Sequence, residues 1–316
     1  MKVLVTGANG FVGSWLVRRL LEAGHAVVGG VGPEGSVETL TPAERSRVTW
    51  RPVDLGDGAS LGGALAHPVD AVVHLAARAS VSDSLSDPVA VWAVNAVGTV
   101  RLLEAVERSR EATGSDPAVL LVSTGEVYGR GAGSAARREE DPVAPVSPYA
   151  ASKAAVELAG LEAWRRTGLR VIVARPFPHT GPGQSPRFVV PAFIERIGAA
   201  RRSRARSVPT GNLEPVRDFL DVRDVSEAYL RLLERGEPGT VYNVASGGGI
   251  GLRQLFDRIA ALVGCSVEPR PDDALARAAD IPHLVGDASR LRAATGWSPR
   301  FTLDETLQLM IDAKAD

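Results

Sequence analysis

Two side chains with acid–base potential, Tyr149 and Lys153, lie four residues apart in the stretch SPYAASK that begins at Ser147. On a helix this spacing places both side chains on one face. A free phenol has a pKa of about 10, but a nearby ammonium stabilises the phenolate and lowers that pKa. Tyr149 would then serve as a general acid or base, whereas the same pair on an ordinary surface helix would do no chemistry.

A hydroxyl cluster and a carboxylate follow the predicted strand at 118–123, namely Ser123, Thr124 and Glu126. The carboxyl ends of parallel strands form the edge at which α/β proteins bind ligands, so we expect this cluster to lie beside Tyr149. Thr124 can donate a hydrogen bond to a reacting oxygen as charge develops on it. Thr124, Tyr149 and Lys153 together predict a centre for proton transfer to or from an oxygen atom.

Residues 7–13, with the sequence GANGFVG, directly follow the first predicted strand and open the first predicted helix. Gly7 permits a tight turn, Gly10 lets backbone N–H groups approach a pyrophosphate, and Gly13 allows close packing of the helix. The N-terminus of the helix also favours an anion. Three turn glycines alone would be a weak signal, but the strand-turn-helix context predicts a dinucleotide site.

Asp54 stands at the end of the third predicted strand, where its carboxylate could accept a hydrogen bond from an adenine amino group. At the end of the second strand, residues 28–32 (VGGVG) contain neither a carboxylate for a ribose 2′-hydroxyl nor an arginine for a 2′-phosphate. The missing negative charge removes repulsion against a 2′-phosphate without attracting one. The predicted cofactor is therefore NADP(H) or NAD(H), with NADP(H) slightly favoured.

The elements that must position these residues alternate as short apolar runs and longer amphipathic stretches, the pattern of parallel strands joined by helices. We predict an α/β fold: a Rossmann-type doubly wound parallel sheet with a smaller α/β substrate-binding lobe. Strands are predicted at 2–5, 26–28, 48–53, 71–75, 118–123 and 170–174, and a helix at 11–23. Pro and Gly cluster after residue 176, and 240–245 is predicted to return to the sheet. The predicted dinucleotide-binding domain therefore comprises 1–176 and 216–244, and the smaller lobe 177–215 and 245–316.

The composition favours a cytoplasmic enzyme that acts on a small molecule. The 316 residues are 45% hydrophobic with a net charge of −1, so no overall field attracts nucleic acid or an anionic membrane. A single cysteine, Cys265, fits a reducing compartment, and no apolar run reaches the length of about 18 residues expected of a membrane span. His74 and His179 have no partners at metal-ligand spacing, so no metal is predicted. The arginine-rich stretch at 201–206 is predicted to be a solvated face.

In these motifs the chain resembles the extended short-chain dehydrogenase/reductase family, which includes NAD-dependent epimerases and dehydratases. The motifs occur in the family's order: the glycine turn, HLAA at 74–77, NAVGT at 95–99, a hydroxyl-Tyr-Gly turn at 124–129, and Tyr149-x-x-x-Lys153. The resemblance implies a catalytic triad of Thr124, Tyr149 and Lys153. The cofactor contacts that it implies are Gly7, Asn9, Gly10, Phe11, Val12, Gly13, Asp54, Leu55, Leu75, Ala76, Ala77, Asn95, Ser123, Tyr149, Lys153, Pro176 and His179.

Within that family the second lobe is most similar to the GDP-4-keto-6-deoxy-D-mannose reductases. The similarity lies in 174–184 (ARPFPHTGPGQ), 187–191 (RFVVP) and 211–219 (GNLEPVRDF). One departure is Pro178, which stands where an asparagine is usual. The same resemblance implies that Arg217 and Arg277 hold the diphosphate, a role that suits guanidinium groups because their donors match phosphate oxygens. The implied contacts of a GDP-linked sugar are Ser80, Val81, Glu126, Val190, Asn212, Arg217 and Arg277.

The motifs leave the reaction open between three chemistries. A 4-ketoreductase needs a hydride and Tyr149 as proton donor, whereas a 4,6-dehydratase also needs a base at C5 and an acid for the C6 hydroxyl. Glu126 could be that base, but Gly125 stands where sugar dehydratases often carry the acid, although some GDP-mannose dehydratases lack it too. NAD(P)H-dependent reduction of a GDP-4-keto-6-deoxyhexose to a GDP-6-deoxyhexose of the GDP-rhamnose type is preferred. A 4-epimerase stays open, and the intact triad argues against a catalytically silent dinucleotide-binding regulator.

The helix predicted after Tyr149 is more apolar than one core-facing stripe requires. Its apolar positions are Ala151, Ala154, Ala155, Leu158, Ala159 and Leu161. We predict a twofold homodimer through this helix and the one at 95–106.

Overall fold

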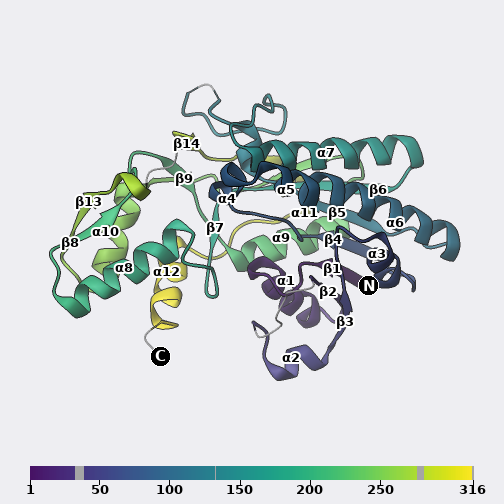
Figure 1. Ribbon diagram of the computed structural model, residues 1–316, viewed down its shortest axis with the longest axis horizontal. Helices are drawn as coiled ribbons and strands as arrows, with labels where there is room; N and C mark the ends of the chain where they lie inside the picture. Colours follow the sequence, from purple (N-terminus) through teal and green to yellow (C-terminus); the bar gives the residue numbers. More distant parts are fainter. Residues whose placement is uncertain (33–38, 132, 276–280, 315–316) are drawn as a thin grey trace.

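The computed structural model of the protein describes residues 1–32, 39–131, 133–275 and 281–314. Its centre is a seven-stranded parallel sheet in the order β11-β6-β5-β4-β1-β2-β3 (Figure 1). The strands are β1 (Lys2–Thr6), β2 (Ala26–Val31), β3 (Val48–Pro52), β4 (Ala71–His74), β5 (Ala118–Val122), β6 (Arg170–Pro176) and β11 (Val241–Val244). This sheet confirms the predicted Rossmann-type α/β fold. Each predicted strand is present, although β2 and β6 run further than predicted.

Helices cover both faces of the sheet because successive strand residues point to opposite sides. Val3 and Val5 of β1 lie in the apolar core beneath α1 (Phe11–Glu22), α9 (Val222–Arg235) and α11 (Ser289–Thr295). Leu4 lies in a second core with α3 (Gly58–Ala64), α6 (Gly98–Thr113) and α7 (Pro148–Thr167). Burial on both faces explains why the strands are almost entirely apolar.

A third apolar core lies at the end of the molecule away from the helices on the large sheet (Figure 1). It is formed by α8 (Val189–Ser203), α10 (Leu252–Val263), α12 (Leu303–Asp312) and β8 (Ser207–Thr210), which pairs with β13 (Glu268–Pro271). A three-stranded sheet has the order β12 (Gly249–Gly251), β9 (Val216–Asp218) and β14 (His283–Leu284). A separate two-stranded sheet pairs β10 (Leu220–Asp221) with β7 (His179–Thr180). The two-lobe division at the predicted boundaries stays a prediction, and β9 pairs with strands from 245–316.

Short helices connect these elements: α2 (Pro42–Ser46), α4 (Val81–Ser86), α5 (Pro88–Trp92), η1 (Ala93–Val97), η2 (Gly125–Tyr128) and η3 (Asp273–Leu275). The strands β1, β4, β5 and β6 are neighbours and run in parallel, so the loops that follow them reach the same edge of the sheet. These loops carry the glycine turn, the HLAA motif, Thr124 and His179. The fold therefore gathers the predicted cofactor and catalytic residues at one edge.

Candidate active site

Thr124 and Tyr149 meet at the carboxyl end of β5. Thr124 precedes η2, and its hydroxyl accepts a hydrogen bond from the Glu126 N–H at 3.3 Å. Tyr149 lies in the first turn of α7, which begins where it does because Ser147 caps it: the Ala150 N–H donates to the Ser147 hydroxyl at 3.1 Å. Both predicted catalytic side chains are buried, and the Thr124 hydroxyl is a hydrogen-bond partner of the Tyr149 phenol.

The pKa of Tyr149 is raised above its usual value, which corrects the expectation from the Tyr-x-x-x-Lys spacing. Burial is the largest cause, the Glu126 carboxylate raises the pKa further, and the hydrogen bond from Thr124 lowers it. Lys153 does not reverse this shift, because its ammonium donates instead to the Val122 carbonyl oxygen at 2.7 Å. Tyr149 is therefore protonated at neutral pH, the state required of a proton donor.

Lys153 lies one turn after Tyr149 on α7 and is itself buried. Burial lowers the pKa of Lys153 to about 8, while the Glu157 carboxylate acts to raise it. Asn95 fixes this turn of α7, because its side-chain amide donates to the Ser152 hydroxyl at 3.0 Å. The Asn95 side-chain oxygen accepts from the Arg78 N–H at 2.8 Å, which ties the loop after β4 to the same helix.

Behind the triad, a buried ion pair joins α7 to β6. Arg175 donates from Nη2 and Nε to the two Glu157 carboxylate oxygens, at 2.7 and 2.9 Å. The Ser123 hydroxyl donates to the same carboxylate at 2.5 Å. Arg175 Nη1 also donates to the Tyr128 hydroxyl at 2.8 Å, and that hydroxyl donates to the Asn243 side-chain oxygen at 2.7 Å. The network fixes the relative positions of β5, β6, β11 and α7 around the triad.

The glycine turn forms a narrow cradle at the N-terminus of α1. Gly7 has a φ of 70°, and a Cβ on it would lie 2.9 Å from the Ala76 backbone nitrogen. A Cβ on Gly13 would lie 2.0 Å from the Gly7 carbonyl oxygen. Gly10 is the N-cap residue of α1, and because it has no side chain it makes no capping hydrogen bond to the first N–H groups of the helix. The N–H groups at the N-terminus of α1 are therefore suited to bind a phosphate. The other predicted cofactor contacts in this turn are Asn9, Phe11 and Val12.

The segment after β6 closes over α1. The rings of Phe11 and His179 stack with their centroids 6.3 Å apart and their planes 8° apart. The Trp15 indole N–H donates to the Pro182 carbonyl oxygen at 3.0 Å. Burial lowers the pKa of His179, which leaves a neutral imidazole at neutral pH. His179, a predicted cofactor contact, thus lies at the start of α1, and Pro176, another, ends β6 three residues before it.

A protein-family model described as GDP-mannose 4,6 dehydratase matches residues 4–310. The chain belongs to this family. GDP-6-deoxy-D-mannose reductase of Pseudomonas aeruginosa is 36% identical to it over 312 residues, which is 98% of this chain and 96% of that protein. UDP-glucose 4-epimerase of Mycolicibacterium smegmatis is 36% identical over 319 residues, covering 99% and 98%. The structure of RMD from Pseudomonas aeruginosa complexed with NADPH has a TM-score of 0.83 at 34% identity, covering 99% and 98%. The predicted family and enzyme class are confirmed.

The family's HLAA motif has a structural role here as well as a predicted cofactor role. His74 is buried between the Thr6 hydroxyl, at 2.8 Å, and the Thr99 hydroxyl, at 3.0 Å. Burial, followed by the nearby charge of Lys153, lowers the pKa of His74 to about 3, so the imidazole is neutral. His74 therefore joins β1, β4 and α6. The half-buried residues after it are Leu75, Ala76 and Ala77.

The adenosine side of the predicted cofactor site contains Asp54, whose carboxylate accepts from the Gly56 N–H at 2.8 Å. Leu55 is buried against α6. The glycines of β2 are explained by packing. A Cβ on Gly29 would lie 2.5 Å from the Trp50 ring, and one on Gly30 would lie 2.7 Å from a methyl group of Val53. Neither position has room for the carboxylate or arginine that would discriminate between NAD and NADP.

Three predicted substrate contacts lie near the triad. Ser80 caps α4 by accepting from the Asp83 N–H at 3.1 Å, and Val81 begins that helix, which packs against α7. Glu126 is close enough to Tyr149 for its charge to raise the pKa of the phenol. The structure thus brings Glu126 directly to the triad and places the α4 N-terminus against the helix that carries it.

The other predicted substrate contacts lie on the third core and on β9. Arg217 donates from Nη1 to the Ile281 carbonyl oxygen at 2.6 Å. Asn212 accepts from the Glu214 N–H at 3.0 Å in the loop before β9. Val190 is buried as a whole residue in the third core, so in this structure it presents almost no surface to a ligand. Arg277 lies outside the described residues.

Sequence reasoning missed the residues that support the triad from behind. Glu157 lies one turn after Lys153, and that spacing on a predicted helix could have identified it as a partner for the lysine. Arg175 and Asn243 carry no local signal, because their partners come from distant elements. Their roles depend on the three-dimensional order of the strands.

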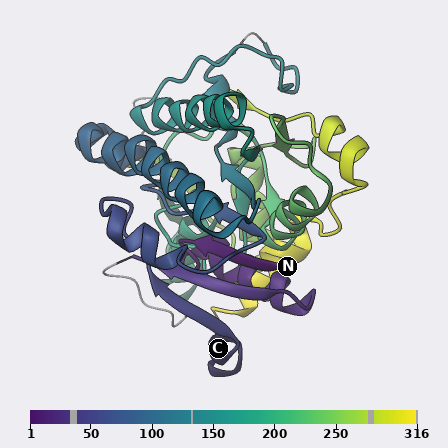
Figure 2. The same ribbon diagram turned by 90° about the vertical axis from the view of Figure 1, so that its right-hand side faces the viewer.

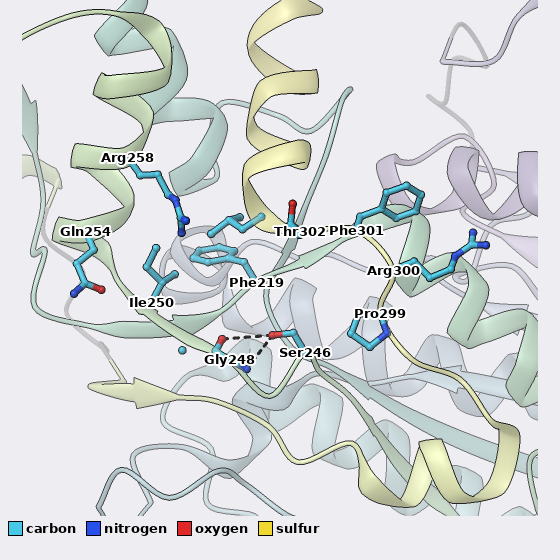
Figure 3. Close-up of a pocket in the computed structure, with 12 residues that line it drawn as sticks. Phe219, Ser246, Gly248, Ile250, Gln254, Arg258, Pro299, Arg300, Phe301 and Thr302 are labelled. Carbon is cyan, nitrogen blue, oxygen red and sulfur yellow. Dashed lines mark hydrogen bonds between the residues drawn. The ribbon is translucent and has the colours of Figure 1, made fainter.

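A hollow of about 630 Å³ lies between α10, β12 and the start of α12, and contains none of the predicted site residues (Figure 3). Its cations already have partners: Arg258 pairs with Asp304 at 2.5 Å, and the Arg300 guanidinium lies 5.6 Å from the centre of the Phe301 ring. The residues that line it are Phe219, Ser246, Gly248, Gly249, Ile250, Gln254, Arg258, Pro299, Arg300, Phe301, Thr302 and Leu303.

Proposed function

We propose that this protein uses NADPH or NADH to reduce the C4 ketone of a GDP-4-keto-6-deoxyhexose, giving a GDP-6-deoxyhexose of the GDP-rhamnose type. The observation that carries the choice of a reductase is the space at Gly125. Gly125 carries no acid, and a Cβ there would lie 3.1 Å from the Phe177 ring, so the ring would have to shift before any larger residue could be accommodated. A second acid beside Glu126 is what a dehydratase would use there to expel the C6 hydroxyl.

The triad residues suit this reduction. When bound, the reduced nicotinamide supplies a hydride to the substrate carbonyl carbon. Tyr149, protonated at neutral pH, donates its proton to the carbonyl oxygen, so that ketone, hydride and proton give the alcohol. The Thr124 hydroxyl lies beside the phenol and can stabilise charge on the same oxygen, while Lys153 supplies a positive charge behind it.

The cofactor site fits a dinucleotide on the chain's own geometry. The cradle at Gly7 and Gly13 leaves no room for side chains, and the uncapped α1 N-terminus faces it. Two observations support the slight preference for NADP(H). The related reductase structure contains NADPH, and the two glycines of β2 present no carboxylate that would repel a 2′-phosphate.

A 4,6-dehydratase is the second candidate, because the Glu126 carboxylate lies beside Tyr149, where a base for C5 would be needed. Glu126→Gln separates the two functions. In a reductase it should retain much of the NADPH oxidation with GDP-4-keto-6-deoxymannose, since hydride and proton transfer use the cofactor and Tyr149. In a dehydratase, loss of the base should lower turnover of GDP-mannose by about 10²- to 10⁴-fold.

The assay offers GDP-mannose and GDP-4-keto-6-deoxymannose in parallel, each with NADPH and with NADH, and follows nicotinamide absorbance and sugar products. Net oxidation with the keto sugar and no consumption of GDP-mannose supports the reductase. Conversion of GDP-mannose to a keto sugar without net change in the nicotinamide, abolished by Glu126→Gln, overturns the proposal. Interconversion of C4 epimers without net oxidation would make the protein an epimerase.

We propose that the protein is a homodimer in which α5, α6 and α7 pack against the same helices of a second copy. These helices contact one another along one side of the molecule (Figure 2). Together with η1, which joins α5 to α6, they expose an unusual number of large apolar side chains, namely Val89, Trp92, Val97, Val100 and Leu158. The helical stretch Pro88–Thr113 is also long and apolar enough to cross a membrane, but half of its most apolar window is buried within the protein. A partner copy accounts for the exposed half.

Leu158→Glu should convert this dimer into a monomer at micromolar concentration. The side chain is 70% exposed in the single chain, so the change should leave the fold intact. In a twofold dimer each copy would bury a new carboxylate without a partner. Sedimentation velocity provides the measurement, and Leu309→Glu on α12 is the control that should stay dimeric. A wild-type monomer, or a dimeric Leu158→Glu variant, would contradict this assembly.

A further inference from the structure

Residues 181–188, which we call the strap, join β7 to α8 and contact helices on both faces of the large sheet. On one face, the Pro182 carbonyl oxygen accepts the Trp15 indole N–H of α1 at 3.0 Å. On the other face, Arg187 Nη1 pairs with the Asp83 carboxylate of α4 at 3.2 Å, and α4 packs against α7. The strap therefore crosses the carboxyl edge of the sheet, where the glycine turn and the triad lie.

Hydrogen bonds tie the first half of the strap to β7. The Gln184 side-chain amide donates to the His179 carbonyl oxygen at 3.0 Å, and the Thr180 hydroxyl donates to the Gln184 side-chain oxygen at 2.6 Å. The Gln184 N–H also donates to the Gly181 carbonyl oxygen at 3.2 Å. His179 in turn stacks on Phe11 at the N-terminus of α1. The position of the strap is therefore coupled to two predicted cofactor contacts.

One exposed ion pair holds the second half of the strap to α4. The Arg187 side chain is 74% exposed and the Asp83 side chain is 43% exposed, so water and salt screen the attraction between them. Among the described residues, Asp83 is the one ion-pair partner of Arg187. An exposed pair of this kind holds two segments together weakly, which suits a contact that opens and closes repeatedly.

We infer that the ion pair between Arg187 and Asp83 is a latch, which holds the strap closed over a bound dinucleotide and opens to release it. The predicted cofactor contacts lie on both sides of the path of the strap, at Phe11 on α1 and at 76–77 after β4. A dinucleotide that spans them is enclosed while both ends of the strap are attached. Arg187 and Asp83 are therefore positioning residues, which set the rate of cofactor release. The inference needs only the dinucleotide site, so it is independent of the sugar reaction proposed above.

The test is stopped-flow measurement of NADPH release from the full-length protein. Protein loaded with NADPH is mixed with excess NADP⁺, and the fall in the fluorescence of bound NADPH gives the dissociation rate constant. Arg187→Gln and Asp83→Asn should each raise this rate constant by about two- to fivefold, the range expected of an exposed ion pair. The double variant should release NADPH no faster than either single variant, because both changes remove one contact. Arg187→Lys retains the charge and should stay close to the wild type.

The other attachment of the strap and a distant ion pair provide two comparisons. Trp15→Phe removes the hydrogen bond to Pro182 and should raise the rate constant by about two- to tenfold. Asp257→Asn is the matched control, because it removes a carboxylate from a similarly exposed pair, with Arg253 on α10 at 3.1 Å. Its release rate should equal that of the wild type. Added salt should reduce the difference between the wild type and Arg187→Gln, because it screens a pair that the variant lacks.

Melting curves show whether each variant is folded, which we expect because both side chains of the latch are exposed. Wild-type release rates in Arg187→Gln and Asp83→Asn overturn the inference. Single effects that add in the double variant overturn it equally, since the two residues would then act separately. NADH is measured in parallel with NADPH, and a wild-type protein that binds neither overturns the inference. Latched release in a protein that does not reduce the keto sugar leaves the inference standing while the proposed function fails.

Discussion

Replacing Tyr149 with Phe should lower kcat of the proposed reduction by about 10²- to 10⁴-fold, the usual contribution of general acid catalysis. The phenol is the buried proton donor at the carboxyl end of β5, and Phe keeps its ring while removing the proton. NADPH affinity should stay within about twofold, because the cofactor is held mainly at α1. Single-turnover measurement of nicotinamide absorbance with GDP-4-keto-6-deoxymannose separates the chemical step from binding.

The matched control is Tyr242→Phe. Tyr242 on β11 is also buried, but its hydroxyl accepts a hydrogen bond from the Glu237 N–H at 3.1 Å and, among the described residues, makes no hydrogen bond to the triad. Its loss should not change the chemical step. A Tyr149→Phe variant that keeps more than about a tenth of wild-type kcat would remove Tyr149 from the role of proton donor.

The pH dependence of the wild-type enzyme should follow Lys153. Burial lowers the pKa of this lysine to about 8, so the ammonium is present below that pH and is lost above it. We therefore expect kcat to fall as the pH rises through about 8. A rate that stays flat to pH 10 would show that the charge of Lys153 does not assist the proton transfer.

Glu157→Gln should lower the free energy of unfolding by about 3–5 kcal/mol, the usual effect of removing one partner of a buried ion pair. The substitution keeps the size of the side chain but leaves the Arg175 guanidinium buried without its carboxylate. It also removes the charge that opposes the lowering of the Lys153 pKa. The pH above which kcat falls should therefore move to a lower value. Chemical denaturation and the pH profile are the two measurements.

Glu162→Gln tests whether burial is the reason why loss of the Glu157 carboxylate should lower the free energy of unfolding. Glu162 lies on the same helix and pairs with Arg166 at 2.6 Å, but both side chains are exposed. Its loss should change the free energy of unfolding by less than about 1 kcal/mol. Equal losses in the two variants would mean that the Arg175–Glu157 pair has no special contribution, and an unchanged pH profile in Glu157→Gln would limit that pair to a structural role.

The fold was predictable from sequence because its signals are local. The glycine turn, the alternation of apolar strands and amphipathic helices, and the Tyr-x-x-x-Lys spacing each lie within a few consecutive turns of chain. They correctly predicted the parallel sheet and the family. Because the strands are parallel, their direction then predicted the edge of the sheet at which these residues lie.

Features that depend on contacts between distant segments were not predictable. The pKa of Tyr149 was expected to be lowered by Lys153, but burial dominates, and the depth of burial is set by elements packed above the sheet. The partners of Arg175 come from α7 and η2, and Asn243 on β11 accepts from Tyr128 on η2. No short motif contains either set of contacts.

The packing of β2 against β3 restricts how the cofactor preference of this enzyme can be redesigned. An aspartate introduced at Gly29 to bind a 2′-hydroxyl would collide with Trp50 on β3, and one at Gly30 would collide with Val53 just after β3, so each change would require a compensating truncation there. At Gly32, by contrast, no described atom lies within 4 Å of the position of a Cβ. Gly32 is therefore the site at which a library of acidic and basic residues could vary coenzyme selectivity with least damage to the scaffold.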